Sequence, residues 1–295
     1  MTAMVTPFKA VTGEPIDWEA VDRVVDHLMA TGSEGLVVRG TTGESPTLTG
    51  EEKVRLFHEV REALDGTGSV VAGTGTYSTA ESIQMSQEAQ EAGVDGLLLV
   101  VPYYNKPTQE GLYLHFKTIA ESTDLPCILY NVPSRTITSL AAETTIRLSQ
   151  MPNIVGIKEA SADFDQITKI VEGAAQGFKV WSGNDSDTFS IMCLGGYGVV
   201  SVASHLAGRQ IKAMMQMLLD GSMERASAEH RRLLAMFKGL FVVSNPIPVK
   251  YCVNLAGFDV GKPRLPLNEP DEKTASFLRD LVGQYKIDLP VESAA

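Results

Sequence analysis

Eight short apolar runs, spaced at intervals of roughly 20 to 35 residues, constrain the fold of this chain more than any other feature. They are Ala3–Val5, Gly35–Val38, Val70–Ala72, Leu97–Val100, Cys127–Leu129, Ile154–Ile157, Phe178–Trp181 and Val199–Val202. Each has the length of a short strand, and most are continuously apolar instead of alternating with polar residues. This pattern is typical of strands that are buried on both faces of a parallel sheet.

Amphipathic helical patterns lie between the apolar runs. A candidate N-cap, Asp17, precedes the first of them, and Thr49 with Glu52 forms a capping-box signature before the second. Gly93 follows the third in a helix-ending position. The apolar positions at helical spacing are Val21, Val24, Val25, Leu28 and Met29, then Leu56, Val60, Ala63 and Leu64, then Ile83, Ala89 and Ala92.

The alternation of strand and helix patterns through residue 220 predicts an α/β fold, a (β/α)8 barrel formed by residues 1–221. An open doubly wound sheet is the alternative. Gly73-Thr74-Gly75 lacks the third glycine of the dinucleotide fingerprint that would support that alternative. After residue 221 the patterns are helical, at 226–241, 249–255 and 272–281. Residues 222–295 are therefore predicted to form a C-terminal helical extension, with 290–295 at its periphery.

Composition excludes several classes of function. The chain has 295 residues, a net charge of −11 and a pI of about 5.0, without an extended lysine and arginine cluster. We therefore expect no nucleic-acid partner.

The longest apolar run, 97–102, is too short to span a membrane, and the N-terminus lacks a signal-peptide pattern. Cys127, Cys193 and Cys252 are widely spaced, which argues against disulfides or zinc and fits the cytoplasm. The histidines lack HxxxH spacing, so we expect no metal.

Lys158 is the residue that first suggests a chemistry. It ends the apolar run 154–157 within Gly156-Ile157-Lys158-Glu159-Ala160. An ammonium at the end of a buried strand loses water, so its pKa should fall, and a neutral amine can attack a carbonyl and form a Schiff base. Considered alone, such a lysine more often extends to solvent or pairs with a neighbour, here Glu159.

Polar residues follow the other apolar runs, at the strand ends where a barrel of this class forms its active site. Tyr130 ends the run before that of Lys158, so its phenol is expected near the amine. Arg135, in the loop that follows, can bind a carboxylate through two hydrogen bonds. The remaining strand-end segments are Arg39–Glu44 with its two threonines, Pro102–Pro107 with Tyr103 and Tyr104, Ser182–Asp185 with Gly183, and Ser201 with Ser204.

Together these motifs resemble the dihydrodipicolinate synthase family of the pyruvate-dependent class I aldolase superfamily, over nearly the whole chain. The GxKEA and GTTGE elements are typical of the superfamily, whereas the tyrosine pair and YNVPSRT are closer to synthase-specific. The matching segments are Gly40–Ser45, Pro102–Pro107, Tyr130–Thr136, Gly156–Ala160 and Asn245–Lys250.

The resemblance implies catalytic roles for four residues. Lys158 would form the Schiff base with pyruvate, and Tyr130 would donate and accept protons. Thr41 would link Tyr130 to Tyr104, with Tyr104 contributed by a neighbouring subunit. The implied reaction joins pyruvate to aspartate semialdehyde in lysine and diaminopimelate biosynthesis, without a cofactor, in a cytoplasmic homotetramer that is a dimer of dimers.

The resemblance also implies substrate-binding roles. Thr42 and the backbone at Val200 would hold the pyruvate carboxylate and its surroundings, and Gly183 belongs with them. Arg135 would receive the carboxylate of aspartate semialdehyde. The alternative enzyme is an aldolase or dehydratase that acts on a sugar-derived 2-keto acid and uses the same Lys158 and Tyr130. Arg135 and the Tyr103–Tyr104 pair distinguish the synthase from this alternative. A catalytically inactive barrel that senses a keto acid is a second alternative, and the intact catalytic set argues against it.

The sequence departs from the family pattern in two places and in its predicted regulation. Arg39 replaces a small or apolar residue, and Ile137 stands where glycine is common, beside Arg135. The resemblance implies that the lysine-feedback site of some relatives uses polar or histidine side chains after Ser45 and an asparagine after the third strand. Glu81 and Tyr103 match this site, whereas the other positions carry Pro46, Gly50, Lys53 and Tyr77. We therefore predict that inhibition by lysine is weak or absent.

Overall fold

The computed structural model describes residues 1–288, so the predicted periphery 290–295 lies outside the described residues. Eight strands follow chain order in one eight-stranded sheet, which confirms the predicted (β/α)8 class. The strands are β1 (Thr2–Ala3), β2 (Gly35–Val38), β3 (Ser69–Gly73), β4 (Gly96–Val100), β5 (Cys127–Asn131), β6 (Ile154–Glu159), β7 (Lys179–Ser182) and β8 (Gly198–Val199).

The strands are parallel and most of their residues are buried, as their continuous apolar runs predicted. All residues of β2 and of β5 are buried, and β4 pairs with β5 in parallel register. The eighth strand differs from its prediction: it ends at Val199 instead of Val202. Ser201 forms a parallel bridge with Thr2, and its carbonyl accepts the Ala3 N–H at 2.8 Å, so the chain has already turned to β1 at this point.

The chain divides into two compact units, residues 1–68 with 201–295 and residues 69–200. The predicted boundary at residue 221 falls inside the first of these units and stays a prediction. Helices α10 (Met223–Gly239), α11 (Ile247–Leu255) and α12 (Glu272–Gly283) confirm that helices follow residue 221.

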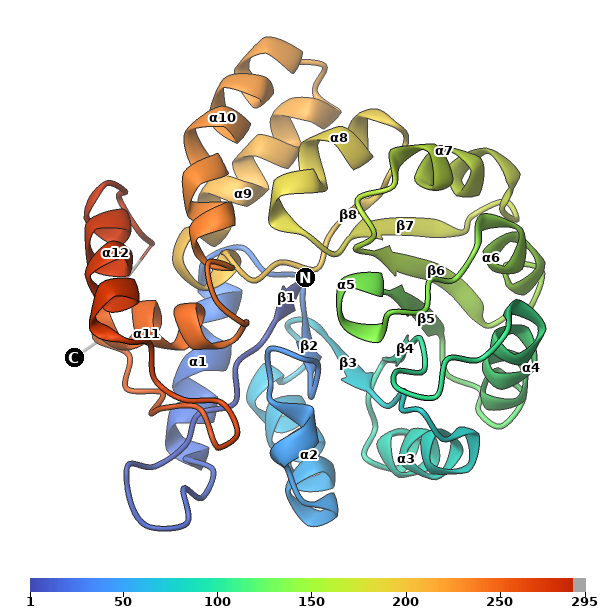
Figure 1. Ribbon diagram of the computed structural model, residues 1–295, viewed down its shortest axis with the longest axis horizontal. Helices are drawn as coiled ribbons and strands as arrows, with labels where there is room; N and C mark the ends of the chain where they lie inside the picture. The colour runs from blue at the N-terminus through green and yellow to red at the C-terminus, as the bar shows by residue number, and fades with distance from the viewer. Residues whose placement is uncertain (289–295) are drawn as a thin grey trace. The chain divides into compact units, whose positions relative to one another are not determined.

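The first unit contains β1 and β2, and its N-terminal helices begin at the predicted caps. Asp17 accepts the Ala20 N–H at 3.2 Å, and Thr49 and Glu52 form the reciprocal capping box. In Figure 1, α9 and α10 run side by side within this unit. Its helices are α1 (Trp18–Ala30), α2 (Gly50–Leu64), α9 (Ser204–Leu219), α10 (Met223–Gly239), α11 (Ile247–Leu255), α12 (Glu272–Gly283) and the 3-10 turn η1 (Ser45–Thr47).

The second unit contains β3 to β8 and the helices that connect them. Its first helix ends as predicted at Gly93, which has a φ of 77°. Figure 1 shows α3, α4, α6 and α7 along the outside of the strands of this unit. Its helices are α3 (Thr79–Glu91), α4 (Gln109–Ala120), α5 (Pro133–Thr136), α6 (Ala142–Leu148), α7 (Phe164–Gly173), α8 (Thr188–Cys193) and the 3-10 turn η2 (Asp185–Asp187).

Candidate active site

Lys158 and Tyr130 lie side by side near the ends of neighbouring strands, as predicted. They are register partners across β5 and β6, and the Nζ of Lys158 lies 4.2 Å from the centroid of the Tyr130 ring. Lys158 is 6% exposed and Tyr130 is 7% exposed. The lysine therefore does not extend to solvent, which removes the commonest explanation of a strand-end lysine.

The environment of Lys158 lowers the pKa of its amine and so favours loss of the proton. Burial lowers the pKa of Lys158 to about 8, with the negative charge of Asp185 opposing this shift and the positive charge of Arg135 adding to it. Asp185 is itself buried, in η2 after β7. At neutral pH an amine with this pKa is unprotonated far more often than an ordinary lysine, so it can act as a nucleophile.

Glycines keep space around Lys158. A β-carbon at Gly183, after β7, would lie 3.2 Å from the Cγ of Lys158 and 2.8 Å from the Cβ of Ala160. A β-carbon at Gly156, in β6, would clash with the Lys179 carbonyl oxygen and the Trp181 ring. Gly183 therefore allows the segment after β7 to pack closely against the Lys158 side chain, and Gly156 allows β7 to approach β6 closely.

Glu159 points away from Lys158, because successive strand residues face opposite sides of a sheet. Both oxygens of the Glu159 carboxylate accept from the Asn131 amide at 3.1 Å. The carboxylate also accepts from the Ser161 N–H at 2.8 Å and from the Gln166 amide at 3.3 Å. Burial raises the pKa of Glu159 against these hydrogen bonds. Asn131, the register partner of Glu159, was missed by sequence reasoning, although it follows Tyr130 directly.

Tyr104 lies in the loop after β4 and is directed outward. It is 89% exposed, and its φ of 76° is unusual for a residue with a side chain. Its neighbour Tyr103 packs edge-on against Tyr77, with ring centroids 5.1 Å apart. Asn105 donates to the Tyr77 carbonyl at 3.0 Å, which ties the loop to the segment after β3. The residues on both sides of Tyr104 are therefore held by contacts with Tyr77, while the Tyr104 side chain itself is exposed.

Arg135 lies in the short helix α5, directly after β5. Its side chain is exposed, and it is close enough to Lys158 for its charge to lower the pKa of that amine. Ile137 ends the helix with φ 64° and ψ −37° and is 71% exposed. Thr136 fixes the turn through hydrogen bonds to the Val132 and Thr138 carbonyls. The departure at Ile137 therefore costs backbone strain beside the predicted carboxylate-binding arginine.

Thr41 and Thr42 lie in the loop after β2, which belongs to the first unit, whereas Lys158 belongs to the second. Thr41 is half-buried and Thr42 is buried. The Asn245 amide donates to the Thr42 hydroxyl at 2.8 Å. Arg39 leaves β2 with a φ of 61° and is 3% exposed. The loop thus starts in an unusual backbone conformation, and a hydrogen bond from Asn245 holds the Thr42 hydroxyl.

Val200 follows β8 in the second unit. Its N–H donates to the Ser182 carbonyl at 2.9 Å, which continues the pairing with β7. What the backbone at Val200 offers a substrate is therefore a carbonyl oxygen, an acceptor, and this suits a protonated group better than a carboxylate.

Metal-binding clusters and membrane-spanning helices are both absent from the described part of the chain. Among residues 1–288, the side chains of histidine, cysteine, aspartate and glutamate form no group of three or more that could hold a metal ion. Within the same residues, no helix combines the length and the apolar character that crossing a membrane requires.

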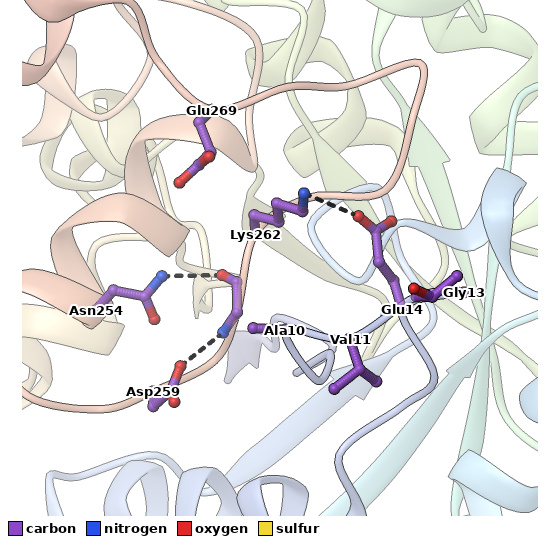
Figure 2. Close-up of a pocket in the computed structure, with 10 residues that line it drawn as sticks. Ala10, Val11, Gly13, Glu14, Asn254, Asp259, Lys262 and Glu269 are labelled. Carbon is purple, nitrogen blue, oxygen red and sulfur yellow. Dashed lines mark hydrogen bonds and ion pairs between the residues drawn. The ribbon is translucent and has the colours of Figure 1, made fainter.

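A pocket of about 940 Å³ lies in the first unit and is lined by none of the predicted site residues. Figure 2 shows Lys262 facing Glu14 across it, with an ion pair of 3.3 Å. Asn254 and Asp259 hold Gly261 at its wall. Because the pocket is lined by none of the strand-end residues that follow β2, β5, β6 and β7, Lys158 remains the candidate site.

The fold and the buried lysine–tyrosine pair define a class, the Schiff-base-forming (β/α)8 enzymes. Residues 1–285 match the model of the dihydrodipicolinate synthetase family. The chain belongs to this family and is therefore an enzyme, a lyase.

Individual relatives agree with the family assignment. The chain is 57% identical over 292 residues to 4-hydroxy-tetrahydrodipicolinate synthase of Dehalococcoides mccartyi strain CBDB1, covering 99% of this chain and 98% of the relative. A dihydrodipicolinate synthase structure from Bacillus anthracis is 44% identical, with a TM-score of 0.94 and 97% of each chain covered. A DHDPS structure from Cyanidioschyzon merolae with lysine bound is 43% identical, with a TM-score of 0.94 and 96% of each chain covered.

Proposed function

We propose that this protein is a 4-hydroxy-tetrahydrodipicolinate synthase, which condenses pyruvate with aspartate semialdehyde in lysine and diaminopimelate biosynthesis. The observation that carries the proposal is the buried Lys158 with a pKa of about 8, 4.2 Å from the Tyr130 ring. The names of the full-length relatives support the choice of reaction.

The proposed chemistry begins at Lys158. Its neutral amine adds to the C2 carbonyl of pyruvate, and loss of water gives an imine on Nζ. Loss of a C3 proton then gives an enamine, which attacks the aldehyde carbon of the second substrate and forms the new carbon–carbon bond. The amino group of aspartate semialdehyde displaces Lys158 by transimination and closes the ring. Tyr130 carries protons in these steps, and because a phenol has a pKa of about 10 it requires hydrogen-bonded neighbours to do so.

The neighbours in this proposal are Thr41 and Tyr104, which extend a proton relay from Tyr130. The 89% exposure of Tyr104 supports its contribution to the site of a second subunit, since an outward tyrosine on a supported loop suits an interface. We accordingly infer a homotetramer built from two dimers. The chain would work in the cytoplasm and without a cofactor, because the Schiff base supplies the electron sink.

Substrate binding in the proposal uses four positions. Thr42 donates its hydroxyl to the pyruvate carboxylate, the carbonyl of Val200 accepts from a protonated group of the bound intermediate, and Gly183 leaves space beside Lys158. Arg135 receives the carboxylate of aspartate semialdehyde, because a guanidinium fits a carboxylate through two hydrogen bonds. The location of Arg135 supports this role, since its side chain is exposed and its charge acts on the amine of Lys158.

Borohydride trapping with pyruvate, followed by peptide mass spectrometry, tests the proposal. We expect a reduced adduct on Lys158 that Lys158→Met abolishes. Lys179→Met is the matched control, because Lys179 begins the neighbouring strand and lies over the Tyr197 ring, 3.8 Å from its centroid. Absence of an adduct, or an adduct elsewhere, would end the Schiff-base mechanism.

Addition of aspartate semialdehyde separates the proposed synthase from the alternative that acts on a sugar-derived 2-keto acid. We expect heterocycle formation, and Arg135→Leu should raise the half-saturating aspartate semialdehyde concentration while leaving the pyruvate adduct intact. An enzyme that traps pyruvate but forms no heterocycle, and that cleaves a keto-deoxy sugar acid, would support the alternative.

A further inference from the structure

Lys250 is a fully buried cation that the proposed mechanism does not use. It lies in α11, and both its side chain and the side chain of Glu44 are 0% exposed. Its Nζ lies 2.8 Å from a Glu44 carboxylate oxygen and donates to the Thr6 carbonyl at 2.9 Å and to the Lys262 carbonyl at 3.2 Å. Such a group is costly to bury unless its partners are well placed, so its location needs an explanation.

Glu44 connects Lys250 to the loop after β2. It follows Gly43 in the GTTGE motif and has a φ of 56°, in the left-handed region. Its second carboxylate oxygen accepts the Arg264 N–H at 2.8 Å. The Arg264 guanidinium binds both carboxylate oxygens of Glu52, at 2.6 and 2.9 Å, near the start of α2. Segments after residue 245 therefore hold this loop at the end next to Glu44.

The same part of the chain holds the loop at its middle. Asn245, just before α11, donates to the Thr42 hydroxyl at 2.8 Å. Thr6 donates to the Gly43 carbonyl at 2.8 Å, and the Thr6 carbonyl is in turn a partner of Lys250. Three contacts from the predicted C-terminal extension thus fix Thr42 and Glu44: Asn245 donates to Thr42, and Lys250 and Arg264 both donate to Glu44. Thr6 fixes Gly43 between them.

We propose that Lys250, through Glu44, is a positioning residue that sets the geometry of Thr42 and so determines recognition of the pyruvate carboxylate. This inference rests on the proposed function, because it takes Thr42 as the residue that binds the carboxylate. The lysine does not touch the substrate. The loop has a residue with left-handed backbone at each end, Arg39 and Glu44, and this conformation is strained. The contact of Lys250 with Glu44 offsets this strain at one end of the loop.

Reductive trapping with cyanoborohydride measures this effect with two ketones, pyruvate and hydroxyacetone, which lacks the carboxylate. In Lys250→Met, loss of charge-assisted hydrogen bonds should raise the half-saturating pyruvate concentration about tenfold or more. Trapping of hydroxyacetone on Lys158 should change little. The variant should therefore lose its preference for pyruvate, which a general loss of folded protein would not cause.

Three further variants separate positioning from stability. Glu44→Gln with Lys250→Met removes both buried charges, so the thermal midpoint should recover relative to Lys250→Met alone while the half-saturating pyruvate concentration stays raised. Lys250→Arg, which keeps the charge and donors, should restore part of the preference. Glu272→Gln on α12 is the control, because its ion pair with Arg279 lies on the exposed surface. This variant should not change the trapping of pyruvate or of hydroxyacetone.

The outcomes are distinguishable. If the wild-type chain traps pyruvate on Lys158 and Lys250→Met has an unchanged preference for pyruvate, the positioning role is wrong and the proposed function stands. The positioning role is also wrong if the double variant restores pyruvate recognition together with stability. If the wild-type chain traps hydroxyacetone and not pyruvate, the proposed function fails, and the positioning role fails with it.

Discussion

The two charges that surround Lys158 act on its pKa in opposite directions, which gives a test at the scale of single residues. The folded-state pKa of about 8 lies below the ordinary value of 10.5, so the rate of pyruvate trapping should rise with pH and level off above about pH 8. Asp185→Asn should move this midpoint down, and Arg135→Gln should move it up. The measurement is the initial trapping rate with cyanoborohydride between about pH 6 and about pH 10, a range that extends about two units to either side of the folded-state pKa. Shifts in the same direction for both variants would contradict this account of the site.

Ile137 allows a second test at this scale. A β-branched residue with φ 64° and ψ −37° is strained, near the γ-turn region, and its side chain is 71% exposed and contributes little by burial. Ile137→Gly should therefore raise the free energy of unfolding by about 1 kcal/mol, after the entropic cost of glycine is subtracted. Ile137→Ala is the control and should give a smaller change, because it keeps the β-carbon. Chemical denaturation of the three proteins checks this, and destabilisation by glycine would show that the side chain is needed.

At the scale of elements, β5 and β6 hold the catalytic pair in register through a second pair on the opposite face. Asn131 and Glu159 are adjacent as Tyr130 and Lys158 are, and the Asn131 amide donates to both carboxylate oxygens of Glu159 at 3.1 Å. Asn131→Asp would place two carboxylates there, at positions that are both 0% exposed. We expect a loss of about 2 kcal/mol or more in the free energy of unfolding at about pH 8.

The sign of the pH dependence makes this prediction specific. Repulsion raises the folded-state pKa of the carboxyl pair above its unfolded value, so stability falls as pH rises through the folded pKa and should recover as pH is lowered toward about 5. The free energy of unfolding at several pH values checks this, with Asn131→Ala as the control, since it adds no second carboxylate. An equal loss at every pH would contradict the assigned orientation of Glu159.

The elements also show what sequence reasoning could and could not predict. Lys158 and Tyr130 each end an apolar run, and neighbouring parallel strands bring such ends together, so their proximity was predictable. The partner of Glu44 was not, because Lys250 lies 206 positions away in a helix whose apolar pattern gives no sign of a buried cation. The end of β8 was misplaced because Val200 and Val202 are apolar, although Ser201 between them turns to pair with Thr2.

At the scale of the whole molecule, the predicted weak response to lysine rests on positions that differ from the feedback site of some relatives. The Cyanidioschyzon merolae relative was crystallised with lysine bound. In this chain Glu81 accepts from the Thr76 hydroxyl at 3.3 Å, and Tyr103 packs against Tyr77. Both matching residues are therefore engaged with local partners, and Tyr77, 49% exposed, replaces the asparagine expected at the lysine site of some relatives.

We therefore expect lysine at millimolar concentration to inhibit heterocycle formation weakly or not at all. The physical reason is that an α-carboxylate and an ammonium require a set of polar partners. Pro46 and Gly50 supply no polar side-chain group at two of the expected positions, and Tyr77 supplies a phenol instead of an amide at a third. Tyr77→Asn should increase sensitivity to lysine by restoring an amide, whereas Tyr77→Phe, which restores none, should not. The coupled assay with both substrates measures this, together with lysine binding by calorimetry. Strong inhibition of the wild-type enzyme at micromolar lysine would show that this chain binds the effector through other residues.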